Sequence, residues 1–343
     1  MRIFARAGNI RRLLRRVPVW VWRLLMHTVK SSETARFNKD PITGVEYTYD
    51  IDFVGAGHRS QLLDVIAPSS AAAHTTALPV YVYFHGGGWT SGDKAALTKY
   101  CASQAAAGMV VINVNYRAAP EFHMAHVLQD ANAALAWAQQ NVSLFGGDPR
   151  RMVLGGDSAG GQIAALLTAA TLRPELSAHY NLQPAVPAKD LKGLVQHCSV
   201  VDFSVFFDRG FVLSLNFIRI LLPGRETGRS QHSRRTRPGE AGTAKPAGGK
   251  HEHLRRATRF LSPIEWLDER HPPVFLTTSE RDYFYTANLN FIDRLREYSV
   301  PVDTLVYEWA KSNTEHTWQQ NYRFPESQEV YRRLQDFVGR VAT

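Results

Sequence analysis

The chain has 343 residues, of which 44% are hydrophobic, and it contains 7 tryptophans. This length and composition suit one large α/β core with appendages and exclude a disordered protein. The two cysteines, Cys101 and Cys198, are too few for a disulfide framework, so we expect two buried thiols. No Cys/His group has the spacing of zinc ligands, and no phosphate-binding loop motif occurs, so we expect no metal.

The net charge of +9 is unevenly distributed along the chain. Residues 1–30 carry eight Lys/Arg and no acidic residue, and residues 225–259 carry a net charge of +7, which leaves the remainder at −6. The body of the protein is therefore mildly acidic. Because the basic charge lies in two appended segments, it bears on where the protein resides and says nothing about a reaction.

The N-terminal segment, residues 1–40, alternates arginines with apolar residues at helical spacing and includes Trp20 and Trp22. Its apolar run is interrupted by Arg23 and is too short to span a bilayer. No convincing secretory cleavage site follows, which favours an intracellular location, and an Arg-rich organellar presequence is another interpretation. Two interpretations stay open for the segment itself: it packs as part of a lid, or residues 1–30 make a peripheral membrane contact.

Apolar runs and turn residues then predict an alternation of strands and helices. Helices are expected near 94–107 and at about 124–141, the second with an apolar stripe along one face. Strands are expected at 47–54, 61–67, 80–84, 109–114, 152–155, 193–198, 273–278 and 302–307. This alternation is typical of an α/β fold with a largely parallel sheet.

A glycine-rich loop, His85 to Trp89, follows the third of these strands. Glycines directly after a strand let backbone N–H groups point into a cavity, where they can stabilise an oxyanion. We expect Gly87 and Gly88 to be such donors, Gly86 to serve the turn, and His85 to anchor the loop. The alternative is an ordinary glycine-rich turn.

The segment Gly156 to Gly161 reads G-D-S-A-G-G and lies between a strand and a helical run. A serine in G-x-S-x-G at such a position occupies a sharp turn that exposes its hydroxyl for attack. We therefore predict that Ser158 is a nucleophile and that the N–H of Ala159 is a third oxyanion donor.

Asp282 and His316 complete the predicted triad. Asp282 follows the strand at 273–278, where a carboxylate can orient an imidazole; Glu280 is its nearest competitor, and a surface or helix-capping role is the alternative. The chain has 13 histidines, and His316 is preferred because it lies after the last predicted strand and before the last helix. The order Ser158, Asp282, His316 is the one expected for α/β hydrolases.

Residues 200–257 interrupt the alternation and are predicted to form an inserted lid. The run 211–222 is apolar nearly all round and predicts a helix that lines an acyl or alkyl pocket. Residues 224–250 have a composition that cannot bury enough surface to order itself, which predicts a disordered basic loop. No aromatic residues interleave its arginines, so we expect no nucleic acid partner.

These motifs together resemble the hormone-sensitive-lipase-like branch of α/β-hydrolase esterases over roughly residues 50–340. The resemblance implies an α/β-hydrolase fold with a mostly parallel eight-stranded sheet, flanking helices and a helical lid. It places the catalytic domain at 41–199 and 258–343, and it implies ester hydrolysis without metal or organic cofactor. The residues that carry it are His85–Gly88, Asn115–Glu121, Gly156–Gly161, Ser262–Pro263, Asp282 and His316.

Two features depart from the pattern of this branch. Asp282-Tyr283-Phe284 replaces the Asp-Pro-Leu that is common in this branch. Trp89 followed by Ser91-Gly92-Asp93-Lys94 is similar to arylformamidases and to prenylcysteine methylesterases. These similarities are short and do not fix a substrate.

The expected function is that of a serine carboxylesterase acting on a small hydrophobic ester. An amide hydrolase of the arylformamidase type and a prenylcysteine methylesterase-like enzyme are alternatives with the same triad. A binding protein that has lost catalysis is a further alternative, disfavoured because the triad and all the glycines are present.

Overall fold

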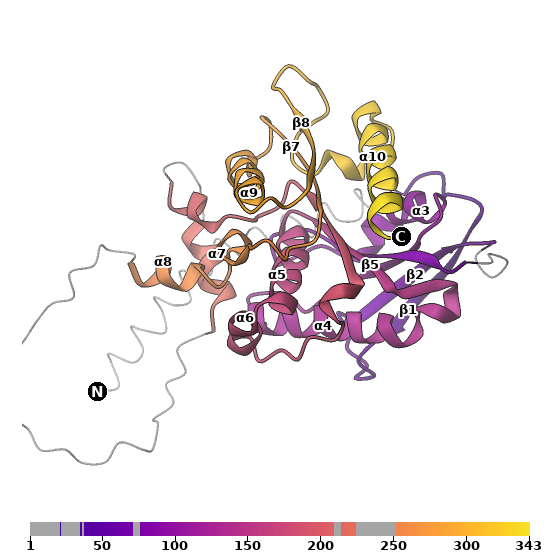
Figure 1. Ribbon diagram of the computed structural model, residues 1–343, viewed down its shortest axis with the longest axis horizontal. Helices are drawn as coiled ribbons and strands as arrows, with labels where there is room; N and C mark the ends of the chain where they lie inside the picture. The colour runs from indigo at the N-terminus through magenta and orange to yellow at the C-terminus, as the bar shows by residue number, and fades with distance from the viewer. Residues whose placement is uncertain (1–20, 22–34, 36–37, 71–75, 209–213, 224–251) are drawn as a thin grey trace, which may run out of the picture.

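The computed structural model describes residues 21, 35, 38–70, 76–208, 214–223 and 252–343 (Figure 1). The predicted basic N-terminal segment and the predicted disordered loop at 224–250 therefore lie almost entirely outside the described residues. The expectations about lid packing, membrane contact and disorder there stay predictions.

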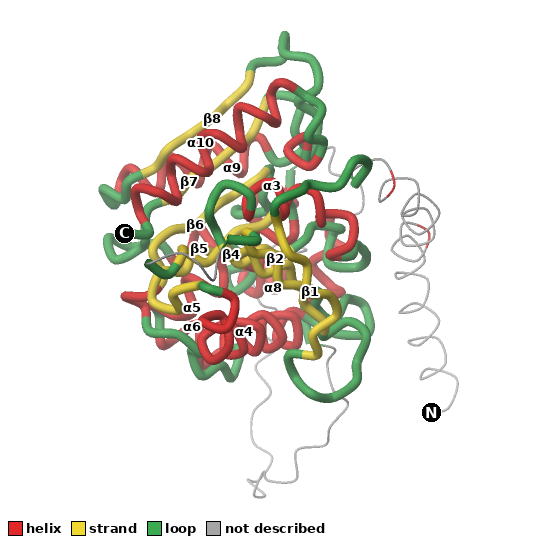
Figure 2. The backbone as a smooth tube through the Cα atoms, turned by 90° about the vertical axis from the view of Figure 1, so that its right-hand side faces the viewer, coloured by secondary structure: helices red, strands yellow, loops and turns green. Residues whose placement is uncertain are grey.

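The described chain forms one eight-stranded sheet in the order β1-β2-β4-β3-β5-β6-β7-β8. β1 and β2, and β2 and β4, pair antiparallel, and all other pairs are parallel. Figure 2 shows β1 and β8 at opposite ends of the twisted sheet. The strands are β1 Val45–Asp52, β2 Leu62–Pro68, β3 Leu78–Phe84, β4 Val110–Val114, β5 Gly147–Asp157, β6 Leu191–His197, β7 Val274–Ser279 and β8 Val302–Tyr307.

All eight predicted strands are present, and β5 is longer than predicted. It begins at Gly147 rather than at residue 152, because Leu78 of β3 pairs with Gly147 across a register shift. The polar residues Asp148, Arg150 and Arg151 hide this extension from a hydrophobicity pattern.

Helices cover both faces of the sheet, as Figure 1 shows. On one face, α4, α5 and α9 contribute to the larger apolar core, and on the other, α3 and α10 contribute to the second core. The helices are α3 Thr98–Ala105, α4 Met124–Asn141, α5 Ala159–Leu172, α6 Pro174–His179, α7 Ser214–Leu221, α8 Glu252–Thr258, α9 Tyr285–Glu297 and α10 Pro325–Val341.

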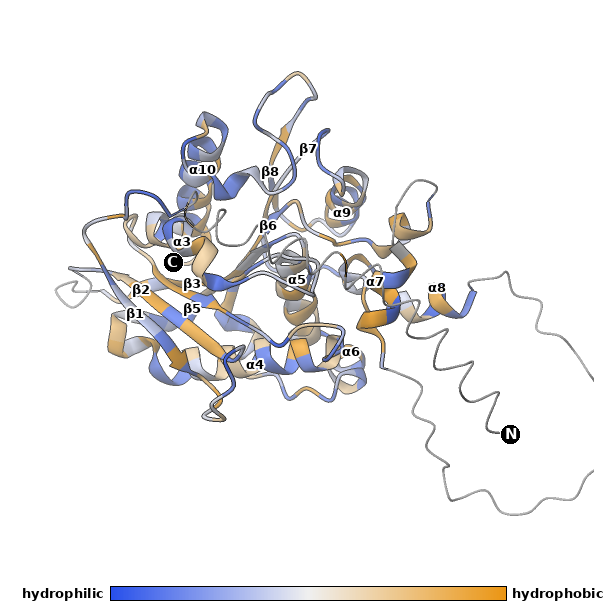
Figure 3. Ribbon diagram, turned by 180° about the vertical axis from the view of Figure 1, so that it is seen from behind, coloured by the Kyte–Doolittle hydropathy of each residue, from blue (hydrophilic) through white to orange (hydrophobic). Residues whose placement is uncertain are grey.

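Strand β3 shows how the sequence serves both cores. Val80, Val82 and Phe84 face the larger core, while Tyr81 and Tyr83 face the second one, since successive side chains of a strand point to opposite faces. Both faces are buried, so the strand is an unbroken apolar run. Figure 3 shows hydrophobic colour along parts of the central strands.

The helix predictions agree closely with the structure. The apolar stripe of α4 is fully buried, and its bounds match those expected. The element expected near 94–107 is a short 3-10 turn, Lys94–Leu97, followed by α3. The Asp93 side chain caps the start of the turn by accepting from the N–H of Ala95.

The predicted lid region is partly described. Within the predicted helix at 211–222, α7 begins at Ser214, and residues 209–213 lie outside the described residues. Ile218 and Leu221 of α7 are buried in the larger core. Among the described helices, none is both long and apolar enough to cross a membrane.

Candidate active site

Ser158 occupies a sharp turn between β5 and α5. Its backbone has φ 52° and ψ −116°, a strained conformation of the kind that gathers at functional sites. The turn is fixed because the N–H of Ser158 donates to the carbonyl of His197, at the end of β6, over 2.9 Å. It also requires Gly156, where a Cβ would lie 2.4 Å from the carbonyl carbon of Gly160. The predicted nucleophile thus stands at the carboxyl edge of the sheet.

Ser158, His316 and Asp282 form one hydrogen-bonded chain. His316 Nε2 lies 2.9 Å from Ser158 Oγ, and its Nδ1 lies 2.6 Å from Asp282 Oδ1. An ionised carboxylate can only accept, so Nδ1 carries the hydrogen and Nε2 accepts from the serine hydroxyl. The Asp282 side chain is fully buried, and that of His316 is 21% exposed. The structure therefore brings together all three predicted residues, in the geometry that activates a serine.

The carboxylate of Asp282 is held by two further donors. The hydroxyl of Thr278 donates to Oδ2 over 2.9 Å, and the N–H of Phe284 donates to Oδ1 over 3.2 Å. The competitor Glu280 is exposed, and its carboxylate accepts instead from the N–H of Trp309. Of the two acidic residues considered, only Asp282 is bonded to His316.

The glycine loop meets the turn that carries Ser158, since the N–H of Gly86 donates to Asp157. Gly87 has φ 118° and Gly88 has φ 59°, and a Cβ on Gly87 would lie 2.3 Å from the carbonyl oxygen of Ser91. Within the described part of the chain, no hydrogen bond is donated by the N–H of Gly87, Gly88 or Ala159. Ala159 opens α5, so the positive end of the helix dipole adds to the same field. These groups suit an oxyanion.

The glycine loop is anchored from behind by two rings. The ring of His85 stacks on that of Tyr116, with centroids 4.5 Å apart, and the Tyr116 hydroxyl donates to the His85 carbonyl over 2.7 Å. Both residues are buried. This contact accords with a structural role for His85 and for Tyr116.

Asp157 is a functional candidate that sequence reasoning missed. Its buried carboxylate accepts from the Tyr83 hydroxyl at 2.9 Å, the Gly86 N–H at 3.0 Å and the Gln320 side-chain amide at 2.8 Å. Burial raises the pKa of Asp157 to about 6, and the hydrogen bonds from Tyr83 and Gly86 oppose this rise. The available signal was its place inside G-D-S-A-G-G, next to the nucleophile. Because the N–H of Gly86 donates to Asp157, it is not among the expected oxyanion donors, which accords with its expected role in the turn.

A series of aromatic rings leads from α7 to His316. Trp89 lies 6.2 Å from Phe217 of α7 and 5.7 Å from Phe203, measured between ring centroids. The rings continue through Phe206 to Phe284, whose centroid is 5.5 Å from that of His316. Aromatic rings thus pack against His316 on the side of Phe284.

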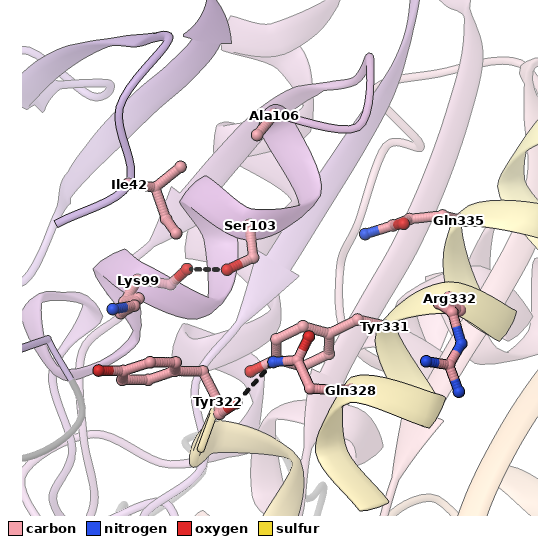
Figure 4. Close-up of a pocket in the computed structure, with 9 residues that line it drawn as sticks. All are labelled: Ile42, Lys99, Ser103, Ala106, Tyr322, Gln328, Tyr331, Arg332 and Gln335. Carbon is pink, nitrogen blue, oxygen red and sulfur yellow. Dashed lines mark hydrogen bonds between the residues drawn. The ribbon is translucent and has the colours of Figure 1, made fainter. Parts of the chain in front are cut away.

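One cavity of about 360 Å³ lies elsewhere, between α3 and α10 (Figure 4). Lys99, Tyr322 and Tyr331 line it, and none of its lining residues belongs to the triad. The Lys99 ammonium is already held by the carbonyl oxygen of Lys39 at 2.6 Å and by the face of the Tyr322 ring. We assign no role to this cavity.

Comparisons with known proteins agree with this picture. A family model described as alpha/beta hydrolase fold matches residues 81–207. Carboxylesterase NlhH of Mycobacterium tuberculosis is 43% identical over 95 residues, which cover 26% of this chain and 28% of the relative. Lipase 2 of Moraxella sp. is 38% identical over 112 residues, which cover 32% of this chain and 26% of the relative. The matches thus span about a quarter of the length of these curated relatives.

Solved structures extend the likeness over the whole chain. Esterase B from Lactobacillus rhamnosis has a TM-score of 0.78 at 19% identity, covering 96% of both chains. An esterase of Pyrobaculum calidifontis has a TM-score of 0.63 at 19% identity, covering 92% of both chains. Identities this low bear on the fold alone. The local similarities to arylformamidases and prenylcysteine methylesterases stay predictions.

The fold, the matched family model and the relatives lead to one assignment. The described chain has the α/β-hydrolase fold, and part of its sequence is similar to carboxylesterases and lipases.

Proposed function

We propose that this protein is a serine carboxylesterase that hydrolyses hydrophobic carboxylic esters through an acyl-enzyme. One observation carries the proposal: Ser158, His316 and Asp282 form an unbroken hydrogen-bonded chain. The N–H groups of Gly87, Gly88 and Ala159, which donate no hydrogen bond among the described residues, support it. Names of the relatives support the same class of reaction.

In the first half of the reaction, Ser158 Oγ attacks the ester carbonyl carbon while His316 Nε2 takes the hydroxyl proton. Asp282 stabilises the imidazolium that results and keeps its ring in place. The negative charge that develops on the carbonyl oxygen is stabilised by the N–H groups of Gly87, Gly88 and Ala159. The tetrahedral intermediate then collapses, and the alcohol leaves with the proton that His316 returns.

In the second half, water attacks the acyl-enzyme. His316 now takes a proton from the water, and the same N–H groups stabilise the second tetrahedral intermediate. Collapse releases the carboxylic acid and returns the proton to Ser158. The free enzyme is then restored, with one water molecule consumed.

The aromatic rings around the triad favour a hydrophobic acyl or alkyl group. Tyr283 and Phe284 pack against the ring of His316, and Phe217 of α7 packs against Trp89 of the glycine loop, so we infer an apolar binding region. A short- to medium-chain or prenyl-like ester fits these surroundings. A related fold, esterase B from Lactobacillus rhamnosis, has been solved with a tributyrin phosphonate.

The deciding experiment compares hydrolysis of p-nitrophenyl acetate, butyrate and palmitate by the wild type, Ser158→Ala and Ser103→Ala. Ser103 lies on α3 and donates to the Lys99 carbonyl, so it is a matched control outside the site. We expect Ser158→Ala to lose turnover and Ser103→Ala to keep it. Mass spectrometry after treatment with a p-nitrophenyl alkylphosphonate should find the label on Ser158.

Activity that survives in Ser158→Ala would overturn the mechanism. N-formylkynurenine is included as a substrate, because an amide hydrolase would use the same triad. Cleavage of this formamide with no ester hydrolysis would replace the esterase assignment with that of an arylformamidase. No cleavage of either kind by the folded wild type would overturn both.

A further inference from the structure

The thiol of Cys198 lies within 4.8 Å of a carboxylate oxygen of Asp282. Cys198 follows β6 with φ 49°, is fully buried, and is fixed because its N–H donates to the carbonyl of Thr277 over 2.9 Å. The side-chain amide of Gln319 donates to its sulfur over 3.4 Å. Since Thr277 belongs to β7 and Gln319 stands three residues after His316, Cys198 is held between the strand that precedes Asp282 and the histidine loop.

The thiol of Cys198, a carboxylate oxygen of Asp282 and a ring nitrogen of His316 all lie within 4.8 Å of one another. Three atoms at such separations share a point no more than about 2.8 Å from each, and zinc bonds to sulfur, nitrogen and oxygen are about 2.0–2.3 Å long. Movements of a few tenths of an ångström would therefore bring all three atoms to bonding distance. The three residues come from separate segments of the chain, so no ligand spacing in the sequence reveals them.

We propose that Cys198, Asp282 and His316 form an inhibitory site for thiophilic divalent cations such as Zn²⁺ and Cd²⁺. Thiolate, carboxylate and imidazole are all common zinc ligands, and the thiolate selects soft cations over Mg²⁺ or Ca²⁺. The imidazole is the one partly exposed member, which gives a cation its route to the site.

Inhibition follows from where the imidazole hydrogen goes, and this step rests on the proposed serine mechanism. His316 Nδ1, which faces Asp282, carries the hydrogen in the free enzyme. A cation bound at Nδ1 displaces that hydrogen, and the neutral ring then carries it on Nε2. Nε2 no longer has a lone pair for the proton of Ser158, so metal binding and catalysis exclude each other. The thiol proton passes to solvent, and no other bond changes.

The test compares metal inhibition within each of three proteins: wild type, Cys198→Ala and Cys101→Ala. Cys101 is the second buried thiol, on α3, and is the matched control. Each activity in Cd²⁺ is divided by that of the same protein in EDTA, so unequal basal rates do not matter. We expect Cd²⁺ to lower kcat reversibly in wild type and Cys101→Ala. The Cd²⁺ concentration that halves the activity should rise at least about tenfold in Cys198→Ala. Loss of a residue that only supports a metal ligand already weakens metal binding by this much, and Cys198 is itself a ligand.

A binding measurement separates this proposal from the proposed function. Equilibrium dialysis with Cd²⁺ uses the inactive Ser158→Ala protein, which keeps all three ligands. One equivalent should bind, and binding should be lost in Ser158→Ala/Cys198→Ala, with Cys198→Ser as a second variant if the alanine protein does not fold. Cd²⁺ binding by a wild type without esterase activity would contradict the proposed function but not the metal site. Equal inhibition of Cys198→Ala and wild type, or no cysteine-dependent binding, would overturn the metal site.

Discussion

The carboxylate of Asp157 accepts a hydrogen bond from the backbone N–H of Gly86 over 3.0 Å. Its other oxygen accepts from the side chain of Gln320 over 2.8 Å. One buried carboxylate next to the nucleophile therefore joins the oxyanion loop to the loop that carries His316. A Cβ on Gly86 would lie 2.2 Å from this carboxylate, so the loop can approach it only because residue 86 is glycine.

Asp157→Asn should lower kcat while changing KM little, because the amide leaves its NH₂ group facing the Gln320 donor and loosens both loops. We expect a loss of about tenfold or more, but less than the roughly 10²–10³-fold that follows deletion of an oxyanion donor. Initial rates with p-nitrophenyl butyrate measure it. Asp148→Asn, on the same strand, is the control, since Asp148 pairs with Arg150 and touches neither loop. A kcat equal to wild type in Asp157→Asn would contradict the role given to this carboxylate.

A pH-dependent stability is expected from His197, whose ring is fully buried between Tyr100 and Thr277. Burial lowers the pKa of His197 to about 3, from 6.5 in an unfolded chain. Below pH 6.5 the unfolded state therefore binds the extra proton, and stability is lost as the pH falls toward 3. At pH 5 the loss from this group is about 2 kcal/mol.

Urea unfolding at pH 7 and pH 5 tests this expectation for His197. In His197→Gln the difference in unfolding free energy between the two pH values should shrink by about 2 kcal/mol. The same substitution at His253, which is exposed on α8, should leave the difference as it is in the wild type. A difference that does not change in His197→Gln would show that the ring is protonated when buried.

Gly160→Ala should destabilise the protein by at least about 1–3 kcal/mol, the usual cost of overpacking a core. The added Cβ would lie 2.0 Å from the carbonyl oxygen of Phe84. This oxygen belongs to the backbone, so it cannot move away as the end of a flexible side chain could. Gly339→Ala is the matched control in α10, because nothing lies within 4 Å of its Cβ position. There alanine should stabilise the helix by about 0.5–1 kcal/mol. Thermal unfolding midpoints of both variants test this prediction. Equal midpoints for Gly160→Ala and Gly339→Ala would contradict the close packing of α5 on β3.

Local patterns explain why much of the fold was predictable. A strand such as β3 is an unbroken apolar run, and the turn at Ser158 is fixed by the small residues beside it, so both are visible in the sequence. The bounds of β5 were less visible, because its first part pairs through Gly147 and polar residues. The assignments of Asp282 and His316 rested on chain order, which the topology of this fold imposes.

The parts of the site that were not predictable depend on distant partners. Nothing near Asp157 in the sequence indicates Gln320, and nothing near Cys198 indicates Asp282, since each pair meets only when the parallel strands align at one edge. Glu280 and Asp282 were both plausible acids by spacing. The direction of each side chain separates them, and direction is a property of the folded turn.

That separation gives the last prediction, in which the two acids are compared by the same chemical change. Asp282→Asn should lower kcat on the order of 10⁴-fold, the loss that follows when the acid of a Ser-His-Asp triad becomes an amide, because the amide favours the wrong imidazole tautomer. Glu280→Gln should keep activity within about twofold of wild type, since its side chain bonds the Trp309 N–H and not His316. Rates with p-nitrophenyl butyrate measure both. A large loss in Glu280→Gln with a small one in Asp282→Asn would reassign the acid, and the buried contacts of Asp282 with Thr278 and His316 argue against that outcome.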